Sequence, residues 1–203
     1  MARKKSATRH ELVLYQRFWG RLWRTTLLFG ALLFILWLVG EYLGLELLGP
    51  GARIWLLFGA LASLLVTLIA LVARRISFVQ AQPDYLRVVT PFFPMRVSYR
   101  RIVANRVSTL AHFFPPADTR GAVRRHIEPF YGRSIVVVEM KGTPMPSWAM
   151  RLFLSRYMYA DQPPRLLFVV DDWMKLSTEI DSALSSWRDR QAYLRHRKKR
   201  GRL

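Results

Sequence analysis

An unbroken run of 20 uncharged residues, Ile54 to Ala73, constrains this chain more than any other feature of its sequence. As a helix rising ~1.5 Å per residue, this run is long enough to cross the roughly 30 Å hydrocarbon core of a bilayer. A second uncharged run extends from Thr25 to Gly40. Both runs are apolar all round, whereas a helix on the surface of a soluble protein is apolar on one face. The sequence therefore predicts two transmembrane helices within residues 23–75.

The charges around these runs predict how they are oriented. Gly49, Pro50 and Gly51 separate the two runs and predict a tight turn, so that the helices form a hairpin. The chain before the first run is basic, with Glu11 as its one acid; its basic residues are Arg3, Lys4, Lys5, Arg9, Arg17, Arg21 and Arg24. Arg74 and Arg75 follow the second run. Because basic segments stay in the cytoplasm, we expect both termini to be cytoplasmic.

Small residues recur along the second run at four-residue intervals, at Gly59, Ser63 and Thr67. Such a stripe lets two helices approach closely in a membrane. The stripe fits packing within the hairpin better than a dimer interface, since the two helices already need each other's small faces.

After Arg75 the hydrophobic pattern changes to that of β-strands. Met95, Val97 and Tyr99 alternate with polar residues and predict a half-buried strand. The sequence Pro91-Phe92-Phe93-Pro94 joins this strand to the preceding one, Tyr85 to Thr90, in a hairpin. Three further strands are expected at Ile102–Leu110, Ile135–Met140 and Leu166–Val170.

A C-terminal helix is expected to close this β domain. Asp171 and Asp172 have the character of an N-cap, and an apolar stripe follows them at helical spacing: Trp173, Leu176, Ile180, Ala183 and Trp187. The basic tail, residues 191–203, is expected to be extended or frayed. His112–Arg133 reads as a long loop, and Pro144–Pro164 reads as two strands or an interfacial helix.

The order of these elements resembles that of bacterial membrane proteins with a PH-like domain. The resemblance is carried by the strand–turn–strand sequence YLRVVTPFFPMRVSYRRI and by the helix after Asp171-Asp172-Trp173, and it covers roughly residues 76–190. It implies a membrane α-hairpin in a bacterial inner membrane, followed by a cytoplasmic, mainly-β PH-like domain. That domain would be a seven-stranded bent sheet or partial barrel capped by the C-terminal helix. Such domains are largely uncharacterised, so the resemblance implies architecture rather than activity.

The sequence gives little support to catalysis. It contains no cysteine and four scattered histidines, which excludes disulfides and thiol catalysis and makes a shared metal site improbable. It contains no phosphate-binding loop and no nucleophile motif. We therefore expect no catalytic residue, no cofactor and no metal.

The charge balance instead favours binding to a polyanion. Lys and Arg number 32 against 13 Asp and Glu, a net charge of +19. This charge suits an anionic lipid leaflet, an acidic partner or nucleic acid. Candidate lipid- or partner-binding residues lie at the hairpin turn and in the tail: Phe92, Phe93, Arg96, Arg100, Arg101, Arg195, Arg197, Lys198, Lys199 and Arg200. We expect the tail to dominate and the two phenylalanines to add a smaller apolar contribution.

Three functions follow, in order of preference. The first is a non-catalytic scaffold or adaptor whose cytoplasmic domain binds anionic lipid or a protein partner. The second is an accessory subunit of a larger membrane complex. The third, a membrane-tethered nucleic-acid binder, ranks last because Tyr193 is the one aromatic residue after Trp187, so that few bases could stack.

Overall fold

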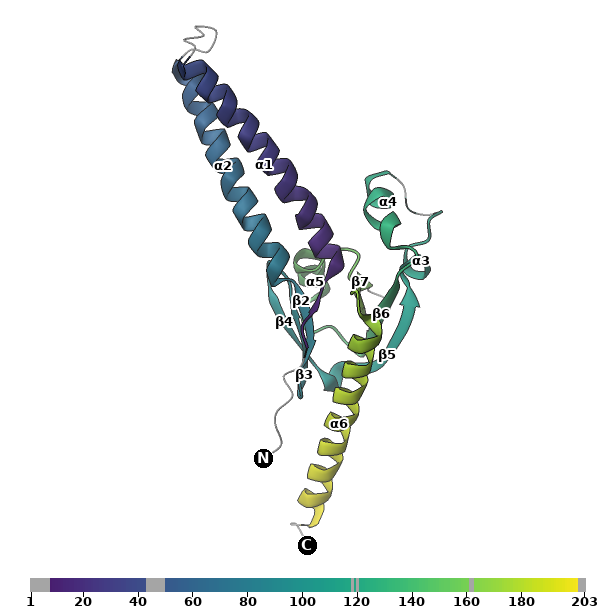
Figure 1. Ribbon diagram of the computed structural model, residues 1–203. Helices are drawn as coiled ribbons and strands as arrows, with labels where there is room; N and C mark the ends of the chain where they lie inside the picture. The colour runs from purple at the N-terminus through teal and green to yellow at the C-terminus, as the bar shows by residue number, and fades with distance from the viewer. Residues whose placement is uncertain (1–7, 43–49, 118, 120, 161–162, 201–203) are drawn as a thin grey trace. The chain divides into compact units, whose positions relative to one another are not determined.

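The computed structural model of the chain describes residues 8–42, 50–117, 119, 121–160 and 163–200 (Figure 1). The expected turn residue Gly49 and the basic residues Arg3, Lys4 and Lys5 lie outside this part. The chain forms two compact units. A helical unit comprises Leu14–Ser77, and a β unit combines the residues up to Val13 with those from Phe78 onward.

Two long helices make up the helical unit, α1 (Val13–Tyr42) and α2 (Pro50–Ile76). Within the described residues, these are the two helices long and apolar enough to cross a membrane. Most of their large apolar side chains are exposed, as side chains that face lipid would be. The expected pair of apolar helices is therefore present.

Small and hydroxyl residues allow α1 and α2 to pack closely. The Oγ1 atoms of Thr26 and Thr67 lie 2.8 Å apart and share a hydrogen bond. A Cβ added at Gly30 would lie 2.9 Å from the Cβ of Ser63, and one at Gly59 would lie 3.0 Å from a methyl group of Leu33. The predicted small-residue stripe thus packs within the hairpin, where it leaves no room for larger side chains.

The described residues of the β unit form two four-stranded antiparallel sheets. Sheet 1 has the order β1-β2-β3-β4, with β1 at His10–Glu11, β2 at Phe78–Ala81, β3 at Tyr85–Val89 and β4 at Pro94–Ser98. A 3-10 turn, η1 (Tyr99–Arg101), leads into sheet 2. Sheet 2 has the order β5-β6-β8-β7, with β5 at Ile102–Thr109, β6 at Ser134–Met140, β7 at Tyr159–Ala160 and β8 at Arg165–Phe168.

Strand β1 is the feature that the sequence does not indicate. It precedes the first long helix, yet it pairs with β2. Leu12 beside it is buried, with 1% of its surface exposed, and the Val13 amide donates to the Val169 carbonyl at 3.0 Å. The His10 Nε2 lies 3.2 Å from a Glu179 carboxylate oxygen. The sequence predicts a separate basic segment, 1–22; its described residues, 8–22, are divided between the β unit and α1.

The alternation predicted for β4 is confirmed. Met95, Val97 and Tyr99 are buried, whereas Arg96 and Ser98 are exposed. The Tyr99 hydroxyl donates to the Gln82 carbonyl at 2.6 Å. Burial, aided by the nearby Asp84 carboxylate and opposed by Arg190, raises the pKa of this hydroxyl well above its usual range. Tyr99 therefore keeps its proton and ties the end of β4 to the β2–β3 turn.

The C-terminal helix α6 (Trp173–Arg200) begins where the sequence predicts. The Asp172 carboxylate accepts a hydrogen bond from the Lys175 amide at 3.1 Å, which confirms the N-cap. The buried stripe consists of Leu176, Ile180 and Leu184, while the tryptophans at the two ends of the predicted stripe are only half-buried. The helix also continues to Arg200, so the expected extended tail is wrong: Arg, Lys, Gln and Ala favour helix, and no Gly or Pro interrupts them before residue 201.

The two stretches without a clear pattern both contain helix. His112–Arg133 includes the end of α3 (Leu110–Phe113), α4 (Gly121–Ile127) and the 3-10 turn η2 (Glu128–Phe130), so a loop throughout is wrong. Pro144–Pro164 contains the short helix α5 (Ser147–Phe153) as well as β7. Neither alternative for this second stretch described it fully.

We predict that the β unit needs β1. Consider a soluble fusion that joins residues 8–13 to Phe78–Leu203 through a short glycine-serine linker. Its free energy of unfolding, measured by urea denaturation, should be higher than that of Phe78–Leu203 alone. The difference should be about 2 kcal/mol or more, because full burial of a leucine side chain contributes about 1.5–3 kcal/mol. Equal free energies of unfolding would show that β1 is dispensable.

A second prediction concerns the face of α6 that packs on the sheets. Ile180→Asp should lower the free energy of unfolding of the β unit by several kcal/mol, a large part of the about 5–15 kcal/mol of a typical domain, because Ile180 is fully buried. Ser182→Asp is the control, since Ser182 is exposed on the same helix. Thermal unfolding of the full chain in detergent measures both. Similar melting of the two variants would mean that α6 does not pack through Ile180.

Candidate functional site

The register of sheet 1 distinguishes its two ends. At one end Phe78 pairs with Val89, and Val89 pairs with Pro94. Both connections to the long helices leave from this end: Ser77 alone separates Phe78 from α2, and Glu11, which pairs with Phe78, lies two residues before α1 begins. We call it the helix-linked end. The turn that contains Phe92 and Phe93 joins β3 to β4 at the same end.

Phe92 is 64% exposed at this turn, and Phe93 packs against α5. The rings of Phe93 and Phe153 lie 5.3 Å apart between centroids. The Thr90 hydroxyl holds the turn, because it donates to the Phe93 carbonyl at 2.9 Å and accepts from the Phe93 amide at 3.2 Å. The two predicted residues thus have different positions: Phe93 packs against α5 and anchors the turn, whereas Phe92 is exposed on the surface.

Helix α5 adds two exposed apolar side chains beside this turn. It buries Ala149 and Met150, while Trp148 and Leu152 are each 67% exposed. The two are four residues apart, so they lie on one side of the helix. We call Phe92, Trp148 and Leu152 the apolar edge. The sequence did not reveal the last two, because a seven-residue helix is too short to give a clear periodicity.

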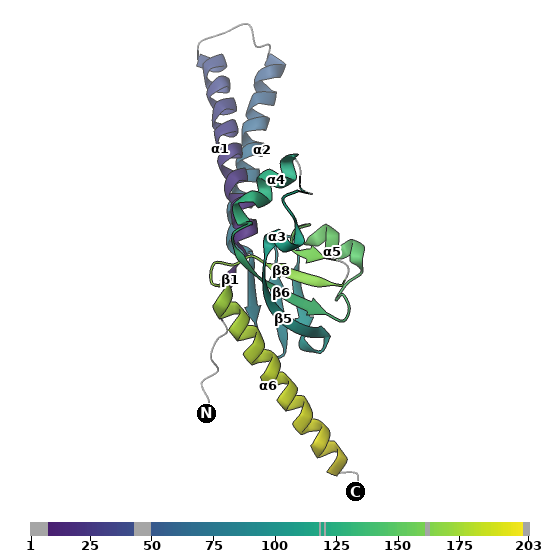
Figure 2. The same ribbon diagram turned by 90° about the vertical axis from the view of Figure 1, so that its right-hand side faces the viewer.

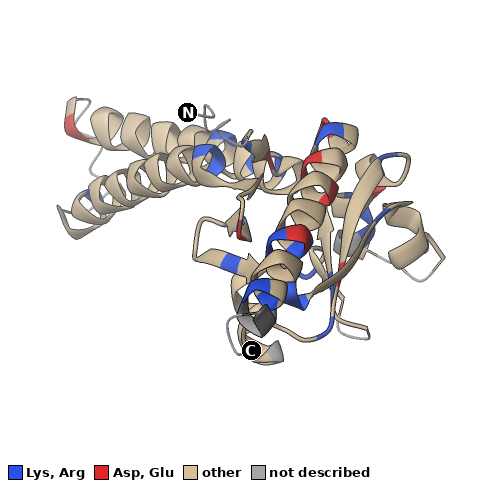
Figure 3. Cartoon of the chain, turned by 90° about the horizontal axis from the view of Figure 1, so that it is seen from below, with Lys and Arg blue, Asp and Glu red and all other residues tan. Residues whose placement is uncertain are grey.

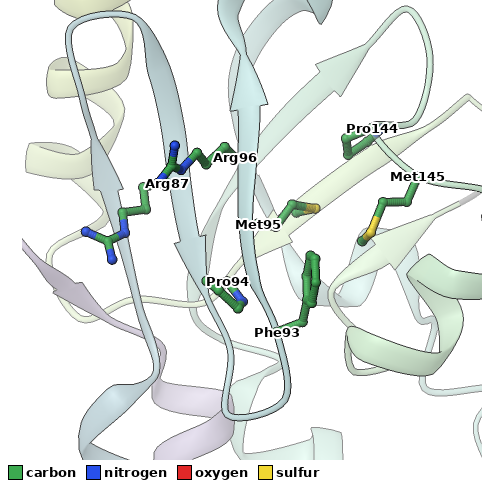
Figure 4. A pocket seen from close by; sticks show the side chains of 7 residues that line it. All are labelled: Arg87, Phe93, Pro94, Met95, Arg96, Pro144 and Met145. Carbon is green, nitrogen blue, oxygen red and sulfur yellow. The ribbon is translucent and has the colours of Figure 1, made fainter.

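An open groove of about 490 Å³ lies along β4; its lining residues are Arg87, Phe93, Pro94, Met95, Arg96, Pro144 and Met145. In Figure 4 the side chains of Phe93, Met95 and Met145 face one another across the groove, while Arg87 and Arg96 extend away from this apolar cluster. The β4 groove therefore has an apolar wall and a cationic side.

The basic residues expected beside Phe92 and Phe93 do not all lie there. Arg96 lies in the middle of β4, opposite Arg87. Arg100 and Arg101 lie in η1, beyond the other end of β4, where Arg101 donates to the Thr143 carbonyl. A strand of five residues is roughly 17 Å long, so Arg100 and Arg101 lie away from the turn, whereas Arg96 lines the β4 groove together with Phe93.

The basic end of α6 also lies away from the helix-linked end. Arg190 contacts the Asp84 carboxylate at 3.2 Å and the Pro83 carbonyl at 2.5 Å, in the β2–β3 turn at the opposite end of sheet 1. Figures 1 and 2 both show the last turns of α6 projecting beyond the sheets, and Figure 3 shows Lys and Arg gathered on its C-terminal half. Arg195 and Arg197 are in these turns; Lys198, Lys199 and Arg200 continue the helix, but their side chains are not described.

The candidate residues thus form two separate groups rather than one surface. From Arg190 to Arg200 the helix advances a further ~15 Å beyond the β2–β3 turn. Charges act over only about 8–10 Å at physiological ionic strength. The tail and the Phe92–Phe93 turn therefore do not act together on one flat surface, contrary to the expectation from the sequence.

No three potential metal ligands cluster in the part of the chain that the structure describes. The expectation that the protein needs no metal, cofactor or catalytic residue remains a prediction. No protein-family model, no curated protein and no solved structure matches the chain.

Proposed function

We propose that this protein is a non-catalytic adaptor of the bacterial inner membrane whose cytoplasmic, PH-like β domain docks on the anionic leaflet. The observation that carries the proposal is the position of the apolar edge. Phe92 lies in a turn at the end of sheet 1 from which both connections to the long helices leave. Trp148 and Leu152 lie on the helix that packs against this turn. If α1 and α2 span the membrane, the chain enters and leaves it through these two connections.

The chemistry of the apolar edge suits a membrane interface. Aromatic side chains are enriched at the level of the lipid headgroups. Exposed apolar side chains that lie together usually mark an interaction site. Each side chain that leaves water contributes about 1.5–3 kcal/mol when fully buried, so three partly inserted ones contribute a few kcal/mol. Because the domain is tethered to the membrane, a gain of this size is enough to hold it there.

Basic residues next to the apolar edge support docking on an anionic surface. Arg151 on α5 and Arg156 just after it are both exposed. Each basic residue close to an anionic leaflet contributes about 1 kcal/mol. The proposed docking surface therefore combines exposed apolar side chains with the positive charge of Arg151 and Arg156.

The same edge also fits the alternative, an accessory subunit of a membrane complex. Exposed tryptophan and leucine side chains are frequent in protein interfaces as well as in membrane interfaces. The two functions differ in what covers the edge, which is lipid in one case and a second protein in the other. The experiments below separate them.

The proposed topology can be tested by cysteine labelling, because the chain has no cysteine of its own. Gly51→Cys, at the start of α2, should react in intact cells with a maleimide that does not cross membranes. Ser182→Cys, on the exposed side of α6, should react only after the membrane is permeabilised. The reverse pattern would place the β domain outside the cytoplasm and reject docking on the inner leaflet.

Docking can be tested with nitroxide labels on single cysteines in the purified full chain, reconstituted in anionic liposomes. Labels at Phe92→Cys and Trp148→Cys should collide with oxygen more than with a water-soluble nickel chelate, because oxygen concentrates in the bilayer. Tyr193→Cys is the matched control: Tyr193 is 68% exposed, but it lies in the last turns of α6. Its label should remain in water.

If the labels at residues 92 and 148 are as accessible to the nickel chelate as the label at residue 193, docking on lipid is wrong. Protection that appears only in native membranes, and not in liposomes of the purified protein, would favour the accessory-subunit function instead.

A further inference from the structure

Three arginines form a row across the outer face of sheet 1. Arg87 pairs with Gln80 on one side and with Arg96 on the other, so that these three residues lie side by side on the face opposite the core. Arg9 directly precedes His10, the residue of β1 that pairs with Val79, and therefore extends the same row. We call Arg9, Arg87 and Arg96 the arginine row.

Aromatic rings hold the guanidinium groups of this row in place. The Arg9 and Arg87 guanidinium carbons lie 4.9 Å and 5.7 Å from the centre of the Phe78 ring, and that of Arg96 lies 5.3 Å from the centre of the Tyr85 ring. A guanidinium that stacks through its face keeps its N–H groups, which point outward in its plane, available for hydrogen bonds. The row is therefore ordered before any ligand binds.

The positive charges of the row are not held in ion pairs with other described residues. Arg87 and Arg96 are direct cross-strand partners, and like charges in such positions repel each other. None of the three arginines forms an ion pair with a described acid, although the carboxylate of Glu11 is on the same face. On sheet 2, by contrast, Arg106 and Arg165 both pair with Glu139, at 3.7 Å and 3.3 Å. A bound anion with several oxygens would remove the repulsion in the row.

The β4 groove provides an apolar surface next to the same charges. Arg87 and Arg96 border the groove, and Phe93, Met95 and Met145 form its apolar wall. Its volume of about 490 Å³ is in the range of small-molecule sites, ~300–1,000 Å³. A ligand that matches both parts carries a phosphate and an apolar chain.

From these contacts we propose that the arginine row and the β4 groove bind one anionic phospholipid. The lipid phosphate accepts hydrogen bonds from Arg87 and Arg96, and part of an acyl chain lies against Phe93 and Met145. Arg9 adds charge from β1. This inference rests on the proposed function, because it requires the domain to face the leaflet, but it assigns a discrete site that is separate from the apolar edge.

The test counts lipids bound to the purified full chain in neutral detergent micelles by native mass spectrometry, with dioleoyl phosphatidylglycerol added. Wild-type protein should retain one lipid molecule. The double variant Arg87→Gln, Arg96→Gln should bind it at least tenfold more weakly. The control, Arg100→Gln with Arg195→Gln, removes the same charge at the other end of the domain and should bind as wild type does. If both double variants lose lipid affinity equally, binding depends only on the total charge of the protein, and the proposal is overturned.

Two further experiments test the stacked-arginine geometry and the identity of the ligand. Arg87→Lys with Arg96→Lys retains the charge and the fold but lacks the planar guanidinium, so it should also bind more weakly; wild-type affinity would overturn the stacked-arginine geometry. Inorganic phosphate at millimolar concentration should not displace the lipid. Displacement would show that the row is a site for free phosphate and not for a lipid.

Failure of this site and failure of docking give different results. If the site is wrong but docking is correct, the label at residue 92 remains in the bilayer of anionic liposomes while the Gln variant retains lipid in micelles as wild type does. If docking is wrong, the label at residue 92 is accessible to water whatever the arginine variants do.

Discussion

The pairing of Glu11 with Phe78 is the constraint on which the rest of this structure depends. It brings the segment that leads into α1 next to the segment that follows α2, so both connections to the helices leave from one end of sheet 1. The buried side chain of Leu12 and the contact between His10 and Glu179 fasten β1 to the core and to α6. The β unit is thereby closed around an insertion of two long helices, although the insertion interrupts its sequence.

This constraint gives the two ends of the β unit different chemistry. The helix-linked end carries the apolar edge, with the arginine row two residues further along the strands. The opposite end carries Arg100, Arg101 and the basic last turns of α6, beyond the contact between Arg190 and Asp84. The end with the apolar edge is thus suited to a partner that has an apolar interior, such as a membrane. The opposite end is suited to purely electrostatic contacts. Net charge alone does not distinguish these two parts.

The elements that were predicted correctly have strong local signals. The two long apolar runs, the alternation of Met95, Val97 and Tyr99, and the stripe around Leu176 and Ile180 all arise from burial that repeats at a fixed period. The elements that were missed are short. β1 has two residues and α5 has seven, so neither shows enough periodicity to be recognised. The tail was misjudged for another reason: like charges suggested an extended chain, but the helix propensity of its residues and its continuity with α6 keep it helical.

The sequence by itself determined the two membrane-type helices, most of the strands and the capped C-terminal helix, because each depends on neighbours within a few residues. It also indicated Phe92 and Arg96 as candidate binding residues. Only the tertiary structure decided which candidates lie together. The register of sheet 1 places Arg9 and Arg87 in one row with Arg96 and separates Arg100 and Arg101 from Phe92. Strand pairing joins β1 and β2, whose paired residues are about 70 positions apart in the chain, through hydrogen bonds between backbones that leave no trace in local composition.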